Sequence, residues 1–218
     1  MLIEEHFDER DQCPLCRIKA TVNDRLTEQY LGDGVMEDDT RKEVNRLGFC
    51  AHHYKKLFKS RSKIGLALQV STRLNTVNSF IEPPKGTKQA QKQAEAILKL
   101  GTTCVVCKYL DEHMVRYYKT VAEVYKTVAS FKDKLKKTHG FCLEHYAQLL
   151  KYSGYAGGKQ KEYTGDLYEL EASRMAVLGD GLHEFCLRHD YRTIGTPLSE
   201  NASNALKTAS KIFYGEQN

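Results

Sequence analysis

GFCAHHY, at positions 48–54, and GFCLEHY, at positions 140–146, are nearly the same seven residues within one 218-residue chain. Each stretch follows a pair of cysteines spaced as CxxC, CPLC at 13–16 and CVVC at 104–107. The cysteine of the seven-residue stretch follows the second cysteine of the pair by 34 positions in the first case and by 35 in the second. Repetition at a fixed spacing indicates duplication of one structural unit: CxxC, a long insert, then GFCxxHY.

Metal ligation is the chemistry that this pattern favours. A CxxC pair places two thiolates on one tight turn, and CxxH adds a thiolate and an imidazole, which together complete a tetrahedral site. His53 is preferred to His52 because His53 aligns with His145, whereas His52 aligns with Glu144. The predicted metal ligands are Cys13, Cys16, Cys50 and His53 for one ion, and Cys104, Cys107, Cys142 and His145 for a second.

The ligand types favour zinc, with two ions per chain; an iron–sulfur cluster accepts similar ligands and is the second choice. Four protein ligands close a zinc site and leave no position for a bound water, which favours a structural ion over a hydrolytic one. Two other interpretations of the seven cysteines stay open, redox-active thiols and small buried core residues. An odd cysteine count without a secretory signal argues against a disulfide framework.

The composition is that of a globular protein, 41% hydrophobic and 28% charged, without a low-complexity tract. The N-terminal stretch MLIEEHFDERDQCPLC is acidic and has no apolar segment typical of a secretory signal. The longest uncharged run, IGLALQVST at 64–72, is much shorter than the ~20 apolar residues that span a bilayer. We therefore expect a cytoplasmic protein that does not enter the membrane.

The insert of the second unit has the periodicity of a long helix. Its apolar residues recur in alternating steps of four and three, which is a heptad pattern. We predict a helix over 108–137, about 45 Å long at 1.5 Å per residue. The apolar stripe is explained either by packing against other helices of the same chain or by a coiled-coil seam of a homodimer. The stripe consists of Leu110, Met114, Tyr117, Val121, Val124, Val128, Phe131 and Leu135.

Helical periodicity covers most of the remaining chain, and no hairpin signal interrupts it. In the first insert, the acidic DDT at 38–40 is expected to cap a short helix. A helix is predicted over 159–191, and Ser199 or Asn201 is expected to cap a last helix over 200–214. The predicted breaks are LGDG at 31–34, IEPPKG at 81–86, GYAGG at 154–158 and GDG at 179–181.

The sequence thus predicts an all-α fold, a long-helix bundle built from two duplicated helical units, each clipped by a Cys3His metal site. Structural zinc contributes on the order of 10 kcal/mol to folding, which is comparable with the net stability of a domain. The metal is therefore expected to make each small helical unit fold. The predicted parts are a first unit at 1–82, a linker at 83–87, a second unit at 88–157, and C-terminal helices at 158–218 that pack on the bundle.

The formal net charge is +5, and it falls to about +3 if each metal-loaded Cys3His site adds −1. Residues 1–46 hold twelve acidic and seven basic side chains, whereas 55–73 hold six basic and no acidic ones. Residues 116–137 hold seven basic and two acidic side chains. Nucleic-acid binding by these basic helices is possible, but solvated helix faces are favoured because the chain is not strongly basic. The spacing of a C2H2 DNA-reading finger is absent.

No motif of the common catalytic classes is present, since the chain has no GxSxG, P-loop, GxGxxG or HExxH. The CxxC pairs also lack the βαβ setting of a thioredoxin-type redox motif. A third CxxH, Cys186 and His189 in EFCLRHD, has no CxxC before it, and two ligands alone bind a metal weakly. Coincidence on one helix face is favoured there over a decayed repeat or a further site.

The chain resembles the bacterial proteins grouped as domain-of-unknown-function family 6062. The resemblance rests, in order along the chain, on CPLC, GVMEDDTRKEVNRLGFCAHHY, CVVC, GFCLEHYAQLL and the tail from FCLRHDYR to KTASKIFYGE. It implies a bacterial cytosolic protein with no established activity. It further implies that Cys186 is not a dependable ligand position, and that Asp190 and Arg192 hold the C-terminal segment in place or line a site.

The leading hypothesis is a non-enzymatic, zinc-binding helical protein that acts as a binding or scaffold module, with an unidentified protein partner or as a homodimer. One alternative is a thiol and zinc redox sensor in which oxidation ejects the metal. The other alternative is a nucleic-acid-binding protein that uses the basic helices, for which a strong salt dependence of binding is expected.

Overall fold

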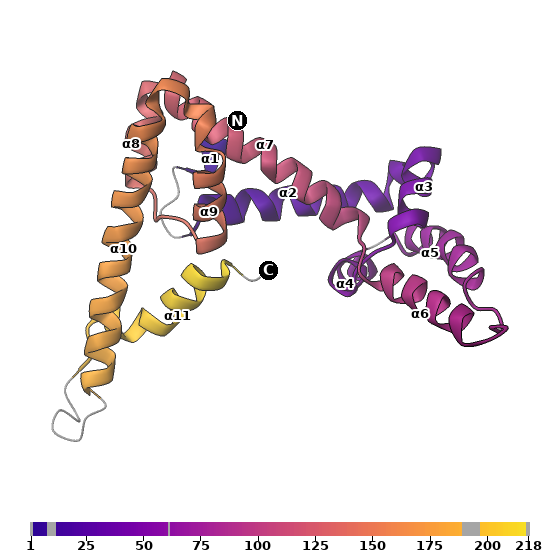
Figure 1. Cartoon of the computed structure of the whole chain (residues 1–218). Coiled ribbons are helices and arrows are strands. Elements are labelled where there is room, and N and C mark those ends of the chain that lie inside the picture. The colour runs from indigo at the N-terminus through magenta and orange to yellow at the C-terminus, as the bar shows by residue number, and fades with distance from the viewer. Residues whose placement is uncertain (1, 8–11, 61, 189–196, 217–218) are drawn as a thin grey trace. The chain divides into compact units, whose positions relative to one another are not determined.

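The computed structural model describes residues 2–7, 12–60, 62–188 and 197–216. Every regular element in these residues is helical, as Figure 1 shows, which confirms the all-α prediction. Among them, no helix combines the length and the apolar character needed to cross a bilayer. The elements are α1 (Leu2–His6), α2 (Pro14–Leu31), η1 (Asp33–Val35), α3 (Asp38–Leu47), α4 (Ala51–Lys59), α5 (Lys63–Asn78), α6 (Thr87–Gly101), α7 (Val105–Thr127), α8 (Ala129–Lys137), α9 (Leu143–Lys151), η2 (Ser153–Lys159), α10 (Gln160–Arg188) and α11 (Glu200–Tyr214), where η marks a 3-10 helix.

The chain divides into two compact units that do not coincide with the two sequence repeats. The first unit consists of Met1–Ala20 and Met114–Asn218, and the second of Thr21–His113. The division differs from the predicted one because α2 and α7 each contribute residues to both units. The predicted linker at 83–87 lies inside the second unit, between α5 and α6.

Helix α2 follows from its sequence. Pro14 occupies the first helical position, where a backbone N–H has no intrahelical partner, so the missing donor costs nothing. The helix ends at Leu31, before Gly32. Its apolar residues recur in steps of three and four, and the resulting face is buried. This face consists of Leu15, Ile18, Val22, Leu26 and Tyr30.

The predicted continuous helix over 108–137 is divided into α7 and α8. Val128 adopts an extended conformation between them, with φ −112° and ψ 104°. The change of direction lets Phe131 pack on Phe7, with ring centroids 5.0 Å apart. Most of the predicted apolar stripe is buried within the chain itself, which is the packing expected for a helix bundle.

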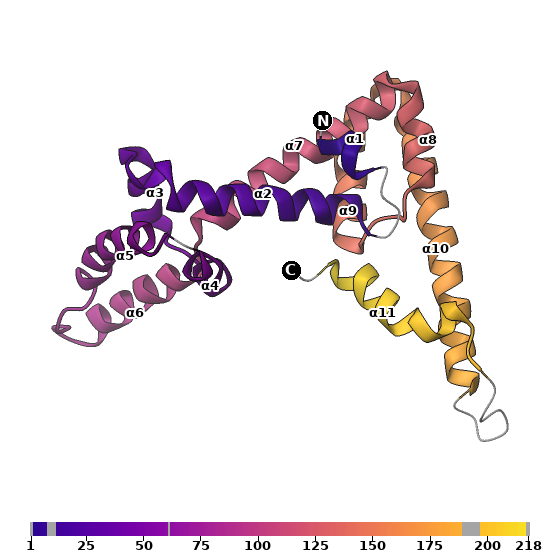
Figure 2. The ribbon, with the colours of Figure 1, turned by 180° about the vertical axis from the view of Figure 1, so that it is seen from behind.

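Helix α10 continues through the predicted break at GDG, 179–181. Gly181 serves close packing instead, since a Cβ at this position would lie 3.0 Å from the carbonyl oxygen of Asn201 on α11. Figure 2 shows α11, in yellow, leading from α10 toward α9, and α11 contacts both helices. The glycine therefore permits the approach of α11 rather than ending α10.

Only one of the two predicted helix caps is made. Ser199 is the N-cap of α11, and its hydroxyl accepts a hydrogen bond from the backbone N–H of Ala202 at 3.2 Å. The residue before α3 is Glu37, whose side chain makes no cap hydrogen bond. Asp38 and Asp39 of the DDT stretch lie inside the first turn of α3, where negative charge favours the helix dipole.

Candidate metal centres

The eight predicted ligands lie in two clusters. Within each cluster, the sulfur and nitrogen atoms that would bind a metal all lie within 4.8 Å of one another. One cluster belongs to the first compact unit and the other to the second. Site A consists of Cys13, Cys16, Cys142 and His145, and site B consists of Cys50, His53, Cys104 and Cys107.

The predicted pairing of CxxC with CxxH inside each repeat is wrong, because each site joins the CxxC of one repeat to the CxxH of the other. Helix lengths explain the exchange. The first CxxC begins α2, whose 18 residues span about 27 Å, whereas the 10 residues of α3 span about 15 Å, too short to lead the chain back over that length. In the second repeat, α7 has 23 residues and α8 only 9. The sequence did not show this imbalance, because it predicted one continuous helix over 108–137 where the structure has α7 and α8.

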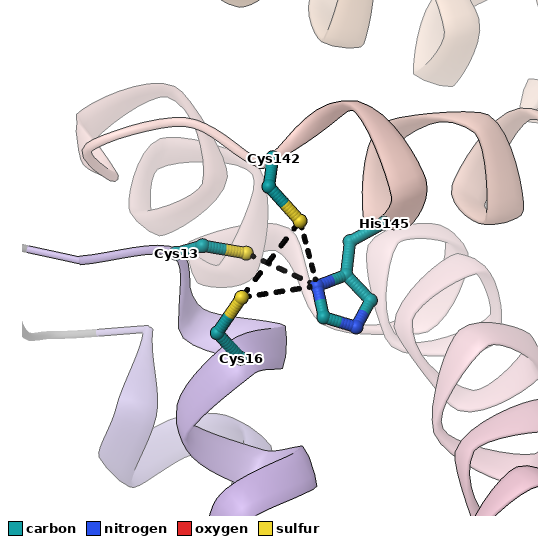
Figure 3. A group of neighbouring side chains, drawn as sticks. All are labelled: Cys13, Cys16, Cys142 and His145. Atoms are coloured by element: carbon teal, nitrogen blue, oxygen red, sulfur yellow. Dashed lines mark hydrogen bonds between the residues drawn. The ribbon is translucent and has the colours of Figure 1, made fainter. Parts of the chain in front are cut away.

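The distances in site A are compatible with a tetrahedral coordination shell (Figure 3). Nδ1 of His145 lies 3.4 Å from Sγ of Cys13, 3.4 Å from Sγ of Cys16 and 3.2 Å from Sγ of Cys142. The sulfurs of Cys16 and Cys142 are 3.7 Å apart. A tetrahedral zinc ion with bonds of about 2.3 Å to sulfur and about 2.1 Å to nitrogen separates two sulfurs by about 3.8 Å and sulfur from nitrogen by about 3.6 Å.

Site B repeats this geometry. Nδ1 of His53 lies 3.2 Å from Sγ of Cys50, 3.4 Å from Sγ of Cys104 and 3.3 Å from Sγ of Cys107. The sulfurs of Cys50 and Cys107 are 3.8 Å apart. One imidazole nitrogen has a single hydrogen or a single lone pair, so it cannot bond three thiols well at once. Both clusters are therefore of a kind that could hold a metal ion at the centre.

The ligands converge because each motif lies at the N-terminus of a helix. Cys142 and Cys50 are the N-cap residues of α9 and α4, and their backbone angles are nearly equal, φ −71° with ψ 158° and φ −71° with ψ 165°. The CxxC pairs lead into α2 and α7, so that the second cysteine of each pair lies in the first helical turn. The partial positive charge of helix N-termini stabilises the thiolates of a Cys3His set.

A glycine and an arginine shape the turn before each N-cap cysteine. Gly48 and Gly140 have positive φ angles of 67° and 91°, which reverse the chain into the next helix. Arg73, on α5, donates hydrogen bonds to backbone carbonyls at the end of α3, which leads into the first turn. Arg174, on α10, donates to the carbonyl of Phe141 in the second turn, at 2.5 Å. Both turns are thus held by a helix that lies after the motif in the chain.

Burial and hydrogen bonding shift the pKa values of several predicted ligands in the two clusters. Hydrogen bonds from Cys13 and Cys16 hold the pKa of the Cys142 thiol far below its usual range, while burial raises the pKa of Cys13. Burial lowers the pKa of His53 to about 4, so its imidazole is neutral at pH 7, as a metal ligand must be. Burial acts in the same direction on His145, but hydrogen bonds to Cys142 and Cys16 outweigh it and raise its pKa to about 9.

The two histidines differ at their other ring nitrogen. Nε2 of His53 lies 2.9 Å from Oδ1 of Asn23, so this nitrogen donates and Nδ1 presents its lone pair to the sulfurs. Nε2 of His145 is buried and has no hydrogen-bond partner among the described residues. The His145 ring packs near Tyr118, with centroids 6.0 Å apart. Orientation of the ring by a hydrogen bond is therefore a feature of site B.

Site A is the more enclosed of the two. All four of its ligands are buried, whereas Cys50 and Cys107 of site B are half-buried. Gly215, which comes directly after α11 and has φ +75°, lies against site A. A Cβ at this position would be 3.2 Å from Sγ of Cys16 and 3.5 Å from Sγ of Cys142. The end of α11 therefore covers the sulfurs, and glycine leaves room for them.

Comparison with known proteins identifies a family for this chain. A family model described as "Family of unknown function (DUF6062)" matches residues 1–218, the whole chain. The chain belongs to the DUF6062 family. This confirms the resemblance based on the CxxC and GFCxxH motifs. No curated protein and no solved structure matches the chain.

In this DUF6062 chain, the remaining sequence candidates lie away from the two clusters or outside the described residues. Cys186 is exposed on α10, and its proposed partner His189 lies outside the described residues, as do Asp190 and Arg192. His52, the rival of the neighbouring ligand His53, is exposed and belongs to neither cluster.

Sequence reasoning missed the residues that support the ligands. Arg73 and Arg174 each lie on a helix after a GFC stretch, but 23 and 32 positions after the N-cap cysteine, so the repeat spacing does not mark them. In the sequence, Asn23 stands out only as a polar residue next to the apolar positions of α2. The structure shows that it is buried. Nothing in the local sequence marks Gly215, because its neighbours, the sulfurs of site A, are distant in the chain.

Proposed function

We propose that the protein holds two structural zinc ions and acts as a non-enzymatic binding or scaffold module. The observation that carries this proposal is the pair of Cys3His clusters, in each of which one imidazole nitrogen lies 3.2–3.4 Å from three sulfurs. Three thiolates with one imidazole favour zinc, and four protein ligands leave no coordination position for substrate or water. Zinc joins the N-termini of α2 and α9 at site A and those of α7 and α4 at site B.

In this proposal, the surface of the protein contacts a protein partner. The compartment is the cytoplasm, whose reducing environment preserves thiolates. Helices α5 and α6 support this part of the proposal. Helix α6 buries none of its residues, and Leu98 and Ile97 on it are 72% and 42% exposed. On α5, Ile64 is 71% exposed. Exposed apolar side chains on these two helices are candidates for contact with a partner.

Elemental analysis of purified full-length protein tests the number, identity and pairing of the ions. We expect two zinc per chain, and one in Cys50→Ser or in Cys142→Ser. Cys13→Ser combined with Cys142→Ser damages site A alone and retains one zinc, whereas Cys13→Ser combined with Cys50→Ser damages both sites and retains none. Wild-type protein that is free of metal after purification under reducing conditions, or that carries iron with inorganic sulfide, would refute the proposal.

One observation favours redox sensing as a second candidate function: Cys50 and Cys107 of site B are half-buried, with their sulfurs 3.8 Å apart. In the proposed step, two thiolates lose two electrons and form a disulfide, hydrogen peroxide takes up the electrons and two protons to become two waters, and zinc is released. A zinc-sensitive dye should report one equivalent released by mild peroxide and rebound after reduction. No release, or equal release from both sites, excludes this candidate.

A further inference from the structure

The outer side of α5 is exposed but carries no charge. Helix α5 contacts α3 and η1, and its buried residues Gly65, Leu66 and Gln69 share one side. On the opposite side, Ile64 is 71% exposed and Leu74 is 53% exposed. The exposed residues that share this outer side, at about 3.6 residues per turn, are Ile64, Ala67, Leu68, Ser71, Leu74, Asn75 and Asn78. A helix with apolar residues all round is typical of a buried position, so we expect the outer side to have a partner.

Helix α6 has an apolar stripe that is separated from its charges. The helix buries none of its residues. Its apolar residues follow one another in steps of four and three, which places them on one face. They are Ala90, Ala94, Ile97 and Gly101, with Leu98 beside them. The charged residues of α6 lie on another side of the helix and are Lys88, Lys92, Glu95 and Lys99. The stripe is therefore a largely exposed seam of the heptad type.

Both apolar surfaces lie on the same side of the hairpin that α5 and α6 form. The two helices are antiparallel (Figure 1). Near their connection, Gln93 donates a hydrogen bond to the carbonyl of Phe80, and farther from it Leu100 lines a small cavity together with Val70. The outer side of α5 is centred about 100° beyond Val70, and the stripe of α6 about 100° beyond Leu100. In antiparallel helices that face each other through these residues, equal rotation in the same sense leads to the same side. We call the combined surface, formed by the outer side of α5 and the apolar stripe of α6, the hairpin face.

The distribution of charge indicates what covers the hairpin face. Residues 44–101 hold eleven basic and two acidic side chains, yet none of them belongs to this face. An acidic protein or a nucleic acid bound there would therefore not meet the cations of the region. Around a two-fold axis a surface meets a copy of itself, so any charge on it would face the same charge. A face without charge is complementary to itself, which favours a second copy of the chain.

The mixture of side-chain sizes on the hairpin face suits helix packing. Large side chains alternate with small ones, and this lets facing helices interdigitate. The large ones are Ile64, Leu68, Leu74, Ile97 and Leu98, and the small ones are Ala67, Ser71, Ala90, Ala94 and Gly101. The face has no aromatic ring, whereas helices that lie on a membrane commonly anchor through Trp or Phe. A helical partner therefore fits the face better than a lipid surface does.

We propose that two copies of this chain associate through the hairpin face, in an isologous dimer whose interface is a bundle of four helices, α5 and α6 from each copy. The proposal rests on the proposed function of a binding module and names a second copy as its protein partner. Leu68 and Ile97, which are 47% and 42% exposed, become buried on association. The seam of the homodimer thus lies on α5 and α6 rather than over 108–137, where most of the apolar stripe is buried within the chain.

Sedimentation equilibrium of the full-length protein tests the proposal, with zinc content measured on the same sample. We expect twice the mass of one chain, which is 24.9 kDa, and dissociation on dilution. Leu68→Glu and Ile97→Glu each place a carboxylate in the interface, where it is unpaired and close to a like charge of the other copy. Each should weaken dimerisation about 100-fold or more. Leu206→Glu is the matched control, because Leu206 is 60% exposed on α11 and lies outside the hairpin face, and it should remain dimeric.

Three outcomes would overturn the proposal. The first is a wild type that is monomeric up to its solubility limit. The second is a dimer that persists when Leu68→Glu and Ile97→Glu are combined. The third is a monomer that binds vesicles of phosphatidylglycerol, which would identify a membrane as the occupant of the face.

Hydrogen exchange of the wild type decides the matter if the glutamate variants lose metal or helicity. Protection of α5 and α6 should rise with protein concentration, and protection that is independent of concentration contradicts the dimer. The zinc content separates the two proposals. A monomer with two zinc per chain refutes the dimer alone, whereas a metal-free dimer refutes the zinc proposal alone.

Discussion

Asn23 orients one predicted metal ligand without being a ligand itself. It is only 8% exposed, and its Oδ1 accepts the hydrogen bond from Nε2 of His53 at 2.9 Å. His145 has no equivalent acceptor among the described residues. We therefore expect the two sites to bind a metal with different affinities although their ligand sets are the same. Among the described residues, only the His53 ring of site B has a hydrogen bond at its second nitrogen.

Replacement of Asn23 tests this support. In Asn23→Leu we expect the zinc affinity of site B to fall about 10–100-fold, the usual effect of removing the partner of a metal-bound histidine. Competition with a calibrated chelator measures the affinity, in a Cys142→Ser background that leaves site B alone. Asn23→Asp retains an acceptor and is the control. Equal affinity in Asn23→Leu and the parent would show that the hydrogen bond has no role.

Gly140 tests the turn before Cys142. Its φ is +91°, and a Cβ there would lie 2.8 Å from Cδ of Arg174 and 2.9 Å from Oε1 of Glu171. Gly140→Ala should therefore lower the free energy of unfolding by about 1–3 kcal/mol. Gly165→Ala, inside α10 with nothing within 4 Å, should raise it by up to about 1 kcal/mol. Urea unfolding of the zinc-loaded variants gives both values, and a shift of the same sign in both contradicts the argument.

At the scale of elements, α11 is tied down at both ends. At its start, the hydroxyl and the backbone N–H of Ser199 donate to Glu184 of α10, at 2.6 Å and 2.9 Å. At its end, Gly215 lies against the sulfurs of site A. Between them, Ala205 and Ile212 pack in the apolar cluster with Leu178 of α10. A single helix thus connects α10 with the metal cluster inside the first unit.

Loss of the cap at Ser199 should loosen the start of this helix. Ser199→Ala removes the acceptor for the N–H of Ala202, which typically costs about 1 kcal/mol. Amide hydrogen exchange should rise in the first turn of α11, while Ser199→Thr, which keeps a hydroxyl, should stay near the wild type. Unchanged exchange in Ser199→Ala would mean that packing alone holds the helix start.

At the scale of the whole molecule, each compact unit contains one complete cluster of predicted metal ligands. A structural zinc ion contributes on the order of 10 kcal/mol, as much as a typical domain has in net stability. Loss of one ion should therefore unfold or loosen the unit that holds it. The crossed pairing determines which residues those are.

Hydrogen exchange in Cys50→Ser separates the two pairings. We expect protection to fall within Thr21–His113, including α6 and the start of α7, and to persist at Cys13 to Ala20. Pairing inside each repeat would produce the opposite pattern, with loss at 13–20 and persistence at 88–113. Cys142→Ser should give the complementary result, with the loss in the first unit.

The sequence by itself determined the four turns that carry the predicted ligands, the helical class, and a cap at the start of the last helix, for which it offered Ser199 or Asn201. These features are local: residues two to four apart on a turn or helix lie together whatever the rest of the chain does. Local patterns did not reveal the break at Val128 or the continuity of α10 at 179–181.

Only the tertiary structure decided which turns come together in one Cys3His cluster. The insert lengths of 34 and 35 positions are almost equal, and a tetrahedral site accepts either CxxH with either CxxC. The choice depends on where the C-terminal ends of α2 and α7 lie, which helix length and packing determine. The same holds for Asn23 behind His53 and for Gly215 over site A, because their neighbours are far away in the chain.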